Sequence, residues 1–279
     1  MHTMSFRTVA TVAVAWLALA GVAHAGEASG YFRMGETRLD VRHAVAVMED
    51  APLDDGERNT LVFLSAAPLD AGQVAAAFDP MDAVREQEPA GGYLRLCITV
   101  DGGDCGLFFS PEGFNSGGYG ELALEEQGDR RIAGRFALAQ PEDFMGKDYQ
   151  FDLRFAADIT PAPGSGLPSG GGAPGAAYNA YLNALAKDDV AALRAMAGED
   201  GQWRYPEDDP TAAREALKSA RDGQPLRAEI ARGRLHGNNA ILWVRGVDRD
   251  DIERAGRVLM VRDGKDWRFE EADLESVDQ

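Results

Sequence analysis

Apolar and polar positions alternate with a period of two along much of the stretch from residue 26 to residue 160. This period is typical of β-strands that have one face in the core and one in water. The runs that follow it, or that are apolar throughout, cover 41–48, 61–64, 93–100, 131–138 and 149–159. Clusters of Gly with Asp or Asn separate them and predict turns, so we expect about seven strands. We predict an all-β domain over 26–160, an antiparallel sandwich or barrel, with a turn or two of helix within 71–85 that breaks at Pro80.

After residue 175 the apolar spacing becomes that of helices. Apolar side chains recur every three or four residues around 178–185 and 190–196. Asp189 is placed to cap the second helix, and Asp209 followed by Pro210 is typical of the start of a third. Four strands are expected next, at 226–232, 240–244, 258–262 and 267–270. Because turn sequences join them into antiparallel hairpins, we predict a small α+β domain over 176–279.

Residues 161–175 separate the two patterns. The segment carries no charge and has Leu167 as its one large apolar side chain. A segment of this composition buries too little surface to order itself, so we predict a flexible Pro/Gly/Ser linker. The regions before and after it are then separate domains.

The second half begins with AYNAYLNALAKDDVAALRAMAG and continues with the hairpin strands ILWVRG and GRVLMVRDGKDWRFEEADLE. This arrangement resembles the nuclear transport factor 2-like superfamily over 176 to about 274. The resemblance implies a cone-shaped fold in which helices pack on a curved sheet and can enclose a pocket. The superfamily includes isomerases, dehydratases, scaffolds and exported modules, so the fold does not determine the function. The first half, with GYFRMG, LDVRHAVAVME, NTLVFLSAAPL and YQFDLRFAADI, resembles an uncharacterised exported bacterial β-domain, which implies no mechanism.

The first 25 residues have the composition of a cleavable signal peptide. Arg7 precedes an apolar stretch, and 23–25 are Ala-His-Ala, the small-x-small pattern that signal peptidase accepts. An apolar stretch of about 15 residues is shorter than the roughly 20 that a membrane-spanning helix needs. We expect a mature chain that starts at Gly26, lies in the periplasm or is secreted, and has no integral membrane segment.

The charge balance narrows the choice of partner. The chain has 28 Lys and Arg against 46 Asp and Glu, a net charge of −18. Nucleic acid binding needs clustered cations that neutralise phosphates, so we expect no nucleic acid partner. Acidity also disfavours adsorption to anionic lipid. We expect a protein or small-molecule ligand of the cell envelope, and a basic partner or a metal ion stays open.

Cys97 and Cys105 are the only cysteines and lie on either side of a Gly-Gly turn. In an exported protein this arrangement favours a disulfide. The spacing is not C-x-x-C, so a redox-active pair is less favoured. The alternation places the two cysteines on opposite faces of their strands, which a bulge or a covered outer face would reconcile.

Aromatic side chains concentrate in the second half and would line the pocket of a cone-shaped fold. The candidate pocket residues are Tyr178, Tyr181, Trp203, Tyr205, Trp243 and His236. Asp208, Asp209 and His236 are the acid or base groups expected near it. Core packing is the alternative interpretation for Tyr181, Trp243 and Trp267.

No motif indicates a catalytic, cofactor-binding or metal-binding residue. His43 is in phase with neighbouring valines and is expected in the core, while His236 lies in the other domain, so zinc is not expected. Acidic clusters at 49–57 and 248–253 lack the spacing of a calcium loop. Serine-nucleophile and phosphate-loop motifs do not occur.

The function that fits these observations is that of an exported periplasmic binding or interaction protein without catalytic activity. It would be envelope-associated, or an inhibitor or immunity protein. The alternative is a small-molecule isomerase- or dehydratase-like enzyme that uses the C-terminal pocket. An acid or base inside an open, mostly apolar cavity would favour the enzyme, and a filled interior would favour binding.

Overall fold

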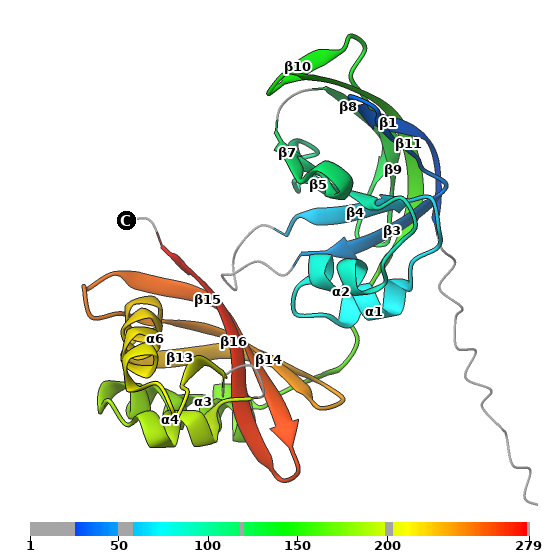
Figure 1. The fold of residues 1–279 in the computed structure, drawn as a ribbon. Coiled ribbons are helices and arrows are strands. Elements are labelled where there is room, and N and C mark those ends of the chain that lie inside the picture. Colours follow the sequence, from blue (N-terminus) through cyan, green and yellow to red (C-terminus); the bar gives the residue numbers. More distant parts are fainter. Residues whose placement is uncertain (1–25, 50–57, 118–119, 199–202, 278–279) are drawn as a thin grey trace, which may run out of the picture.

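The computed structural model describes residues 26–49, 58–117, 120–198 and 203–277. Figure 1 shows two sheets, one formed by the N-terminal region (26–160) and one by the C-terminal region (161–277). The predicted signal peptide, 1–25, lies outside the described residues, as does the 50–57 part of the first acidic cluster.

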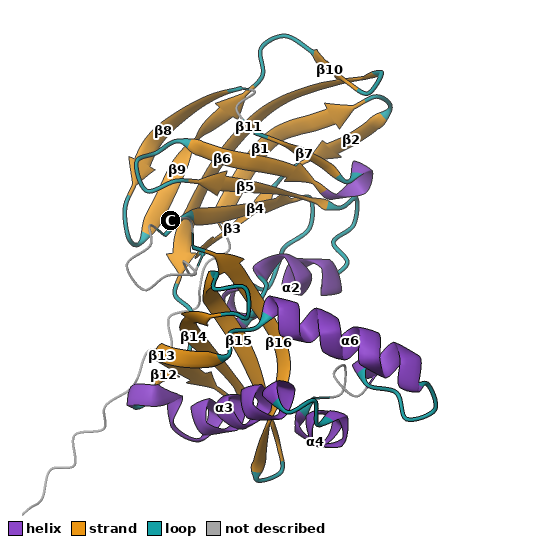
Figure 2. Ribbon diagram, turned by 90° about the vertical axis from the view of Figure 1, so that its left-hand side faces the viewer, coloured by secondary structure: helices purple, strands orange, loops and turns teal. Residues whose placement is uncertain are grey.

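Eleven strands form the first sheet within the described residues. They are β1 (Gly26–Met34), β2 (Thr37–Asp40), β3 (His43–Met48), β4 (Thr60–Ser65), β5 (Tyr93–Ile98), β6 (Asp104–Phe109), β7 (Phe114–Ser116), β8 (Glu121–Gln127), β9 (Arg131–Ala137), β10 (Glu142–Phe144) and β11 (Lys147–Thr160). Their order is β7-β6-β5-β4-β3-β1-β11-β9-β8, with β2 beside β1 and β10 beside β11. Pairing is antiparallel except for a short parallel contact between β11 and β3. The predicted β-rich fold is confirmed, and the sheet curls around one core (Figure 2).

The middle of this sheet is buried on both faces. All six residues of β4 are buried. Val62 and Leu64 point into the curl, whereas Leu61 and Phe63 pack against helices α1 (Ala71–Ala76) and α2 (Pro80–Glu86). This double burial explains why 61–64 is apolar throughout instead of alternating.

Aromatic rings fill the inside of the curl. The Phe32 ring lies 4.4 Å from that of Phe109 and 5.7 Å from that of Phe151, centroid to centroid. Phe136 packs on Phe151 at 4.7 Å. Aromatic contacts of this kind stabilise a core beyond the area that they bury. The side chains inside the curl therefore serve to stabilise the N-terminal region.

The helical segment between β4 and β5 has two separately capped parts. The Asp70 carboxylate accepts a hydrogen bond from the Gln73 amide at the start of α1. Asp79 does the same for the Met81 amide at the start of α2, where Pro80 occupies the first turn. The break was predicted at Pro80, but α1 already ends at Ala76 and Pro80 is the first residue of α2, a position where its missing N–H costs no helix hydrogen bond.

Cys97 in β5 and Cys105 in β6 form a disulfide, with Cα atoms 5.0 Å apart. The predicted pairing is confirmed. Cys97 pairs with Gly106 and Ile98 with Asp104, so Cys105 is the extra residue of a β-bulge. A bulge changes the direction of the side chains around it, which lets the two cysteines meet despite their positions in the alternation.

Helices come first in the C-terminal region and strands follow. The elements are α3 (Gly172–Ala186), α4 (Val190–Met196), α6 (Pro210–Gly223), β13 (Arg227–His236), β14 (Asn239–Val247), β15 (Glu253–Asp263) and β16 (Asp266–Ser276), preceded by the short β12 (Ser165–Gly166). The sheet order is β12-β13-β14-β15-β16. Asp189 and Asp209 cap α4 and α6 through backbone amides, as the sequence predicts. Each hairpin strand is longer than its predicted range.

The structure differs from the prediction of a flexible linker over 161–175. Ser165 and Gly166 pair with β13, and a 3₁₀ turn over Ser169–Gly171 leads directly into α3. A Cβ atom at Gly175 would lie 2.0 Å from the carbonyl oxygen of Gly170 and 2.7 Å from Cδ1 of Ile230. Glycine is used here because it permits close packing. The segment 165–175 is therefore part of the C-terminal region.

Candidate functional site

The second sheet has two faces, and each carries a candidate site. One face is covered by α3, α4 and α6, and the other faces α1 and α2 of the N-terminal region (Figures 1 and 2). On the helix-covered face, Phe269 of β16 lies between two tyrosines of α3. Its ring centroid is 4.1 Å from that of Tyr181 and 6.2 Å from that of Tyr178, and both pairs are stacked. All three side chains are buried.

The buried tyrosine hydroxyls have hydrogen-bond partners. The hydroxyls of Tyr181 and Tyr205 are 3.2 Å apart, and the Tyr178 hydroxyl donates to Oε1 of Gln224 at 2.7 Å. Burial raises the pKa of Tyr178, Tyr181 and Tyr205 above the ordinary value of a tyrosine. Desolvation disfavours the phenolate, so these groups stay protonated at neutral pH.

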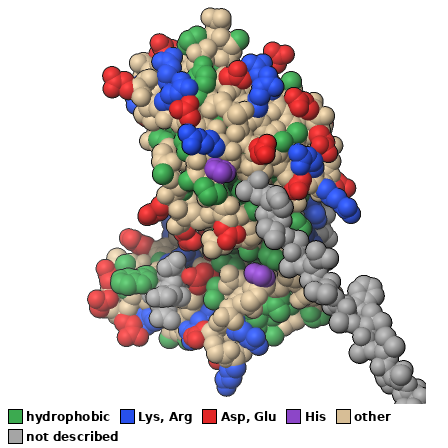
Figure 3. Space-filling view, turned by 90° about the vertical axis from the view of Figure 1, so that its right-hand side faces the viewer, with side chains coloured by type: hydrophobic (Ala, Val, Ile, Leu, Met, Phe, Trp, Pro, Cys, Tyr) green, Lys and Arg blue, Asp and Glu red, His purple; other side chains and the backbone are tan. Residues whose placement is uncertain are grey.

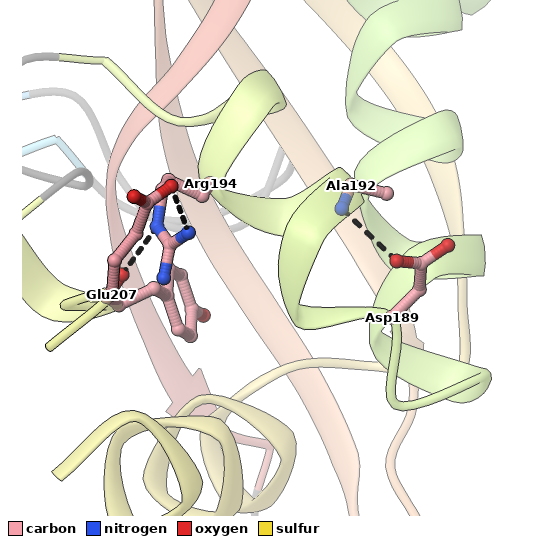
Figure 4. Close-up of polar contacts among 5 residues, drawn as sticks. Asp189, Ala192, Arg194 and Glu207 are labelled. Carbon is pink, nitrogen blue, oxygen red and sulfur yellow. Dashed lines mark hydrogen bonds and ion pairs between the residues drawn. The ribbon is translucent and has the colours of Figure 1, made fainter. Parts of the chain in front are cut away.

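An arginine holds Tyr205 in place. Nε of Arg194, on α4, donates to the Tyr205 carbonyl at 2.6 Å, and Nη1 forms an ion pair with Glu207 at 2.7 Å (Figure 4). The Asp189 carboxylate caps the same helix through the Ala192 amide at 3.0 Å. The chain before α6 is thus fastened to α4, which fixes the Tyr205 hydroxyl beside that of Tyr181.

A groove of about 480 Å³ opens between α6 and β16 at the edge of this aromatic cluster. We call it the helix groove; its lining residues are Tyr181, Arg204, Ala216, Ser219, Ala220, Gly223, Gln224, Ala272 and Leu274. The polar groups are a guanidinium, an amide and hydroxyls, and none of these residues is a carboxylate or an imidazole. The groove can donate hydrogen bonds to an acceptor group, and its described lining residues include no group that acts as a general acid or base near neutral pH.

The structure does not bring the six candidate pocket residues together. Tyr178, Tyr181 and Tyr205 meet on the helix-covered face. Trp243 is buried on the opposite face, His236 lies exposed at the end of β13, and Trp203 is 82% exposed. Alternation along β14 explains the position of Trp243, because Leu242 and Val244 take the helix-covered face.

The acid and base groups expected near the pocket are also elsewhere. Asp209 caps α6, Asp208 is exposed beside it, and Trp267 is only partly buried at the rim of the helix-covered core. His43, expected in the core, is partly buried at the start of β3. Asp248 of the second acidic cluster is buried and pairs with Arg254 at 2.8 Å.

The opposite face of the second sheet contacts the N-terminal region. Phe78, between α1 and α2, is buried against Ile241 and Trp243. Arg257 of β15 donates from Nη1 to the Phe78 carbonyl at 3.0 Å and from Nη2 to Asp273 at 2.8 Å. These contacts join the N-terminal region to the second sheet through residues that are far apart in the sequence.

A cleft of about 530 Å³ lies beside this contact. We call it the junction cleft; its lining residues are Gln73, Ala76, Ala77, Phe78, Asp79, Asp82, Ala83, Glu86, His236, Asn239, Leu259 and Glu271. Acidic side chains come from both regions, Asp79, Asp82 and Glu86 from one and Glu271 from the other. Phe78, Leu259 and the alanines supply apolar surface.

The carboxylates of the junction cleft repel one another. Partial burial and the charges of Asp82 and Asp79 raise the pKa of the Glu271 carboxyl above its ordinary value. Asp273 adds to this effect, and the Arg204 guanidinium opposes it. Desolvation and like charges both disfavour the ionised carboxylate.

Sequence reasoning named one lining residue of the helix groove, Tyr181, and missed the junction cleft. One signal was present, because 79, 82 and 86 have the i, i+3, i+7 spacing that places side chains on one helix face. The contribution of Glu271, from a distant strand, has no local signal. Among the residues that the structure describes, no group of three or more His, Cys, Asp or Glu is arranged to hold a metal ion. In the same part of the chain no helix has the length and apolarity to cross a bilayer.

Comparison with known proteins gives no relative. No protein-family model, curated protein or solved structure matches the chain. On the face shown in Figure 3, basic and acidic side chains are interspersed, and no basic patch gathers there.

Proposed function

We propose that this chain is an exported binding protein without catalytic activity, which holds a small organic ligand in the helix groove. The observation that carries this proposal is the chemistry of the groove. It ends on buried tyrosines whose hydroxyls bond to each other or to an amide, and none of its described lining residues is a carboxylate or an imidazole. Catalysis of the isomerase or dehydratase type needs such a group within reach of the substrate.

The proposed architecture is the cone-shaped fold of the nuclear transport factor 2-like superfamily. The order of elements supports it, since α3, α4 and α6 precede the hairpin strands and pack on one face of their sheet. Export to the periplasm is supported by the Ala-His-Ala sequence at 23–25 and by the disulfide, which persists in oxidising compartments. The acidity of the chain supports a partner other than nucleic acid.

The ligand chemistry follows from the lining of the groove. Arg204 is exposed at the groove and makes no ion pair with any described residue. Ser219 and Gln224 add neutral hydrogen-bonding groups, while Ala216, Ala220 and Leu274 are apolar. An amphipathic molecule with a carboxylate suits this set, because arginine binds carboxylates in bidentate fashion.

The test is recovery of small molecules from a periplasmic extract by ultrafiltration with the mature protein. Ser219→Trp places a large ring in the groove, and Thr211→Trp puts the same ring on α6 outside it. We expect a recovered compound to bind wild type and Thr211→Trp equally by calorimetry and to lose affinity for Ser219→Trp. Conversion of that compound to a product by the wild type would instead establish the enzyme alternative.

A further inference from the structure

The junction cleft has walls that are held in place from both regions. Phe78 is inserted against Trp243 and Ile241, and Arg257 bonds to the Phe78 carbonyl. Nη2 of the same guanidinium donates a hydrogen bond to the Asp273 carboxylate. These contacts lie between the N-terminal region and the second sheet, and the cleft lies next to them. Its volume, about 530 Å³, is within the range of small-molecule sites.

The negative charge of this cleft is only partly neutralised by the protein. Asp79 caps α2, and Asp82 forms an ion pair with Arg85 at 2.7 Å. Glu86 and Glu271 form no ion pair with any residue in the described ranges. Arg257 on β15 is already engaged by Asp273 and the Phe78 carbonyl.

Glu271 shares the cleft with the carboxylates of Asp79 and Asp82. Its carboxyl is perturbed by desolvation and by the aspartates of α2, a combination that marks functional sites when it occurs in a cleft. The charges are spread along the walls and do not converge on one point, since no described cluster has the arrangement of a metal site. A cation whose charges are also spread out suits this arrangement better than a single ion.

We propose that the junction cleft binds a linear aliphatic polyamine. Its ammonium groups would lie beside Glu271 and Glu86, and its methylene chain would lie along Phe78 and Leu259. Each ammonium supplies several N–H donors to carboxylate oxygens, which makes these hydrogen bonds stronger than neutral ones. The apolar wall shields the methylenes from water and favours a chain over a compact, fully hydrated cation. This site is separate from the helix groove.

Titration calorimetry of the mature protein with spermidine tests the proposal. We expect one binding site, and we expect Glu86→Gln together with Glu271→Gln to lower the affinity about tenfold. Glu275→Gln removes the same charge from the same strand, β16, outside the cleft, and should leave the affinity within about twofold. Spermidine attracted only by the net charge of the protein would lose as much affinity with Glu275→Gln as with Glu86→Gln or Glu271→Gln made singly.

A steric variant provides a readout that does not alter charge. Gln73 lies on α1, is exposed and lines the cleft, so Gln73→Trp should block binding while leaving the fold intact. Ser219→Trp, in the helix groove, should not change spermidine binding, which separates this proposal from the proposed function. Absence of spermidine binding to the wild type, or binding that survives both the double substitution and Gln73→Trp, would overturn the proposal.

Discussion

The two faces of the C-terminal sheet differ in how their polar groups are satisfied. On the helix-covered face, Tyr178 and Tyr181 are neutral, buried and hydrogen-bonded. On the face toward the N-terminal region, the Arg232 guanidinium lies 3.7 Å above the ring of Trp243. The indole N–H of Trp243 is buried and has no hydrogen-bond partner among the described residues. Glu271 faces further negative charge on the same side.

This difference separates groups that stabilise the fold from groups that do not. A buried polar group with a partner contributes modestly to stability, whereas one without a partner costs free energy. Like charges beside each other also destabilise the folded state. The helix-covered face is therefore built for stability, and the junction face retains features that stability does not explain. Binding sites commonly show this conflict.

The largest loss of stability is expected when the Phe269 ring, on which Tyr178 and Tyr181 stack, is removed. Phe269→Ala removes a buried side chain from the middle of a stack, and truncations of this kind cost about 3–5 kcal/mol. Leu259→Ala, on the neighbouring strand but the junction face, removes a partly buried side chain and should cost less. Urea unfolding of the mature proteins measures both. A larger loss from Leu259→Ala would reverse the comparison of the two faces.

A smaller loss of stability is expected when a single tyrosine hydroxyl is removed. Tyr181→Phe leaves the buried Tyr205 hydroxyl without its partner, which costs about 1–3 kcal/mol. Tyr178→Phe is the matched control, because Gln224 lines the open groove and water can replace the lost hydroxyl there. We expect the free energy of unfolding to fall more for Tyr181→Phe. Equal losses would show that water reaches both hydroxyls.

Much of the secondary structure could be predicted because its signals are local. Asp79, Asp189 and Asp209 each precede a helix and cap it with their own side chains. The alternation along Lys147–Thr160 marks β11 without any knowledge of its neighbours. Signals of this kind depend on residues only a few positions apart.

The remaining features depend on contacts that are distant in the sequence. The glycines of 161–175 have the composition of a linker, and only the position of Ile230 shows that Gly175 is needed for packing. Aromatic content predicted a pocket, but it did not show that Trp243 would take the face opposite Tyr181. The junction cleft combines α2 with β16, and no local pattern relates these two segments.

The smallest change in stability is expected for a substitution at Glu271. It should stabilise the folded protein, whereas the substitutions above destabilise it. Desolvation, followed by the charges of Asp82, Asp79 and Asp273, raises the pKa of this carboxyl, and Arg204 opposes them. His236 of β13 lines the same cleft. A carboxyl with a raised pKa in the folded state favours folding at low pH. It opposes folding once the pH exceeds that pKa, because the unfolded chain ionises more easily.

Glu271→Gln should therefore raise the melting temperature of the ligand-free protein at about pH 7.5. The gain should be small, as is usual for charges that keep contact with solvent. It should vanish as the pH falls below the ordinary glutamate pKa of about 4.3, where the wild-type carboxyl is also neutral. Differential scanning calorimetry at both pH values, with Glu275→Gln as the control, measures this. A lower melting temperature for Glu271→Gln at neutral pH would show that Glu271 stabilises the contact between the regions, and the two faces would then not differ as described.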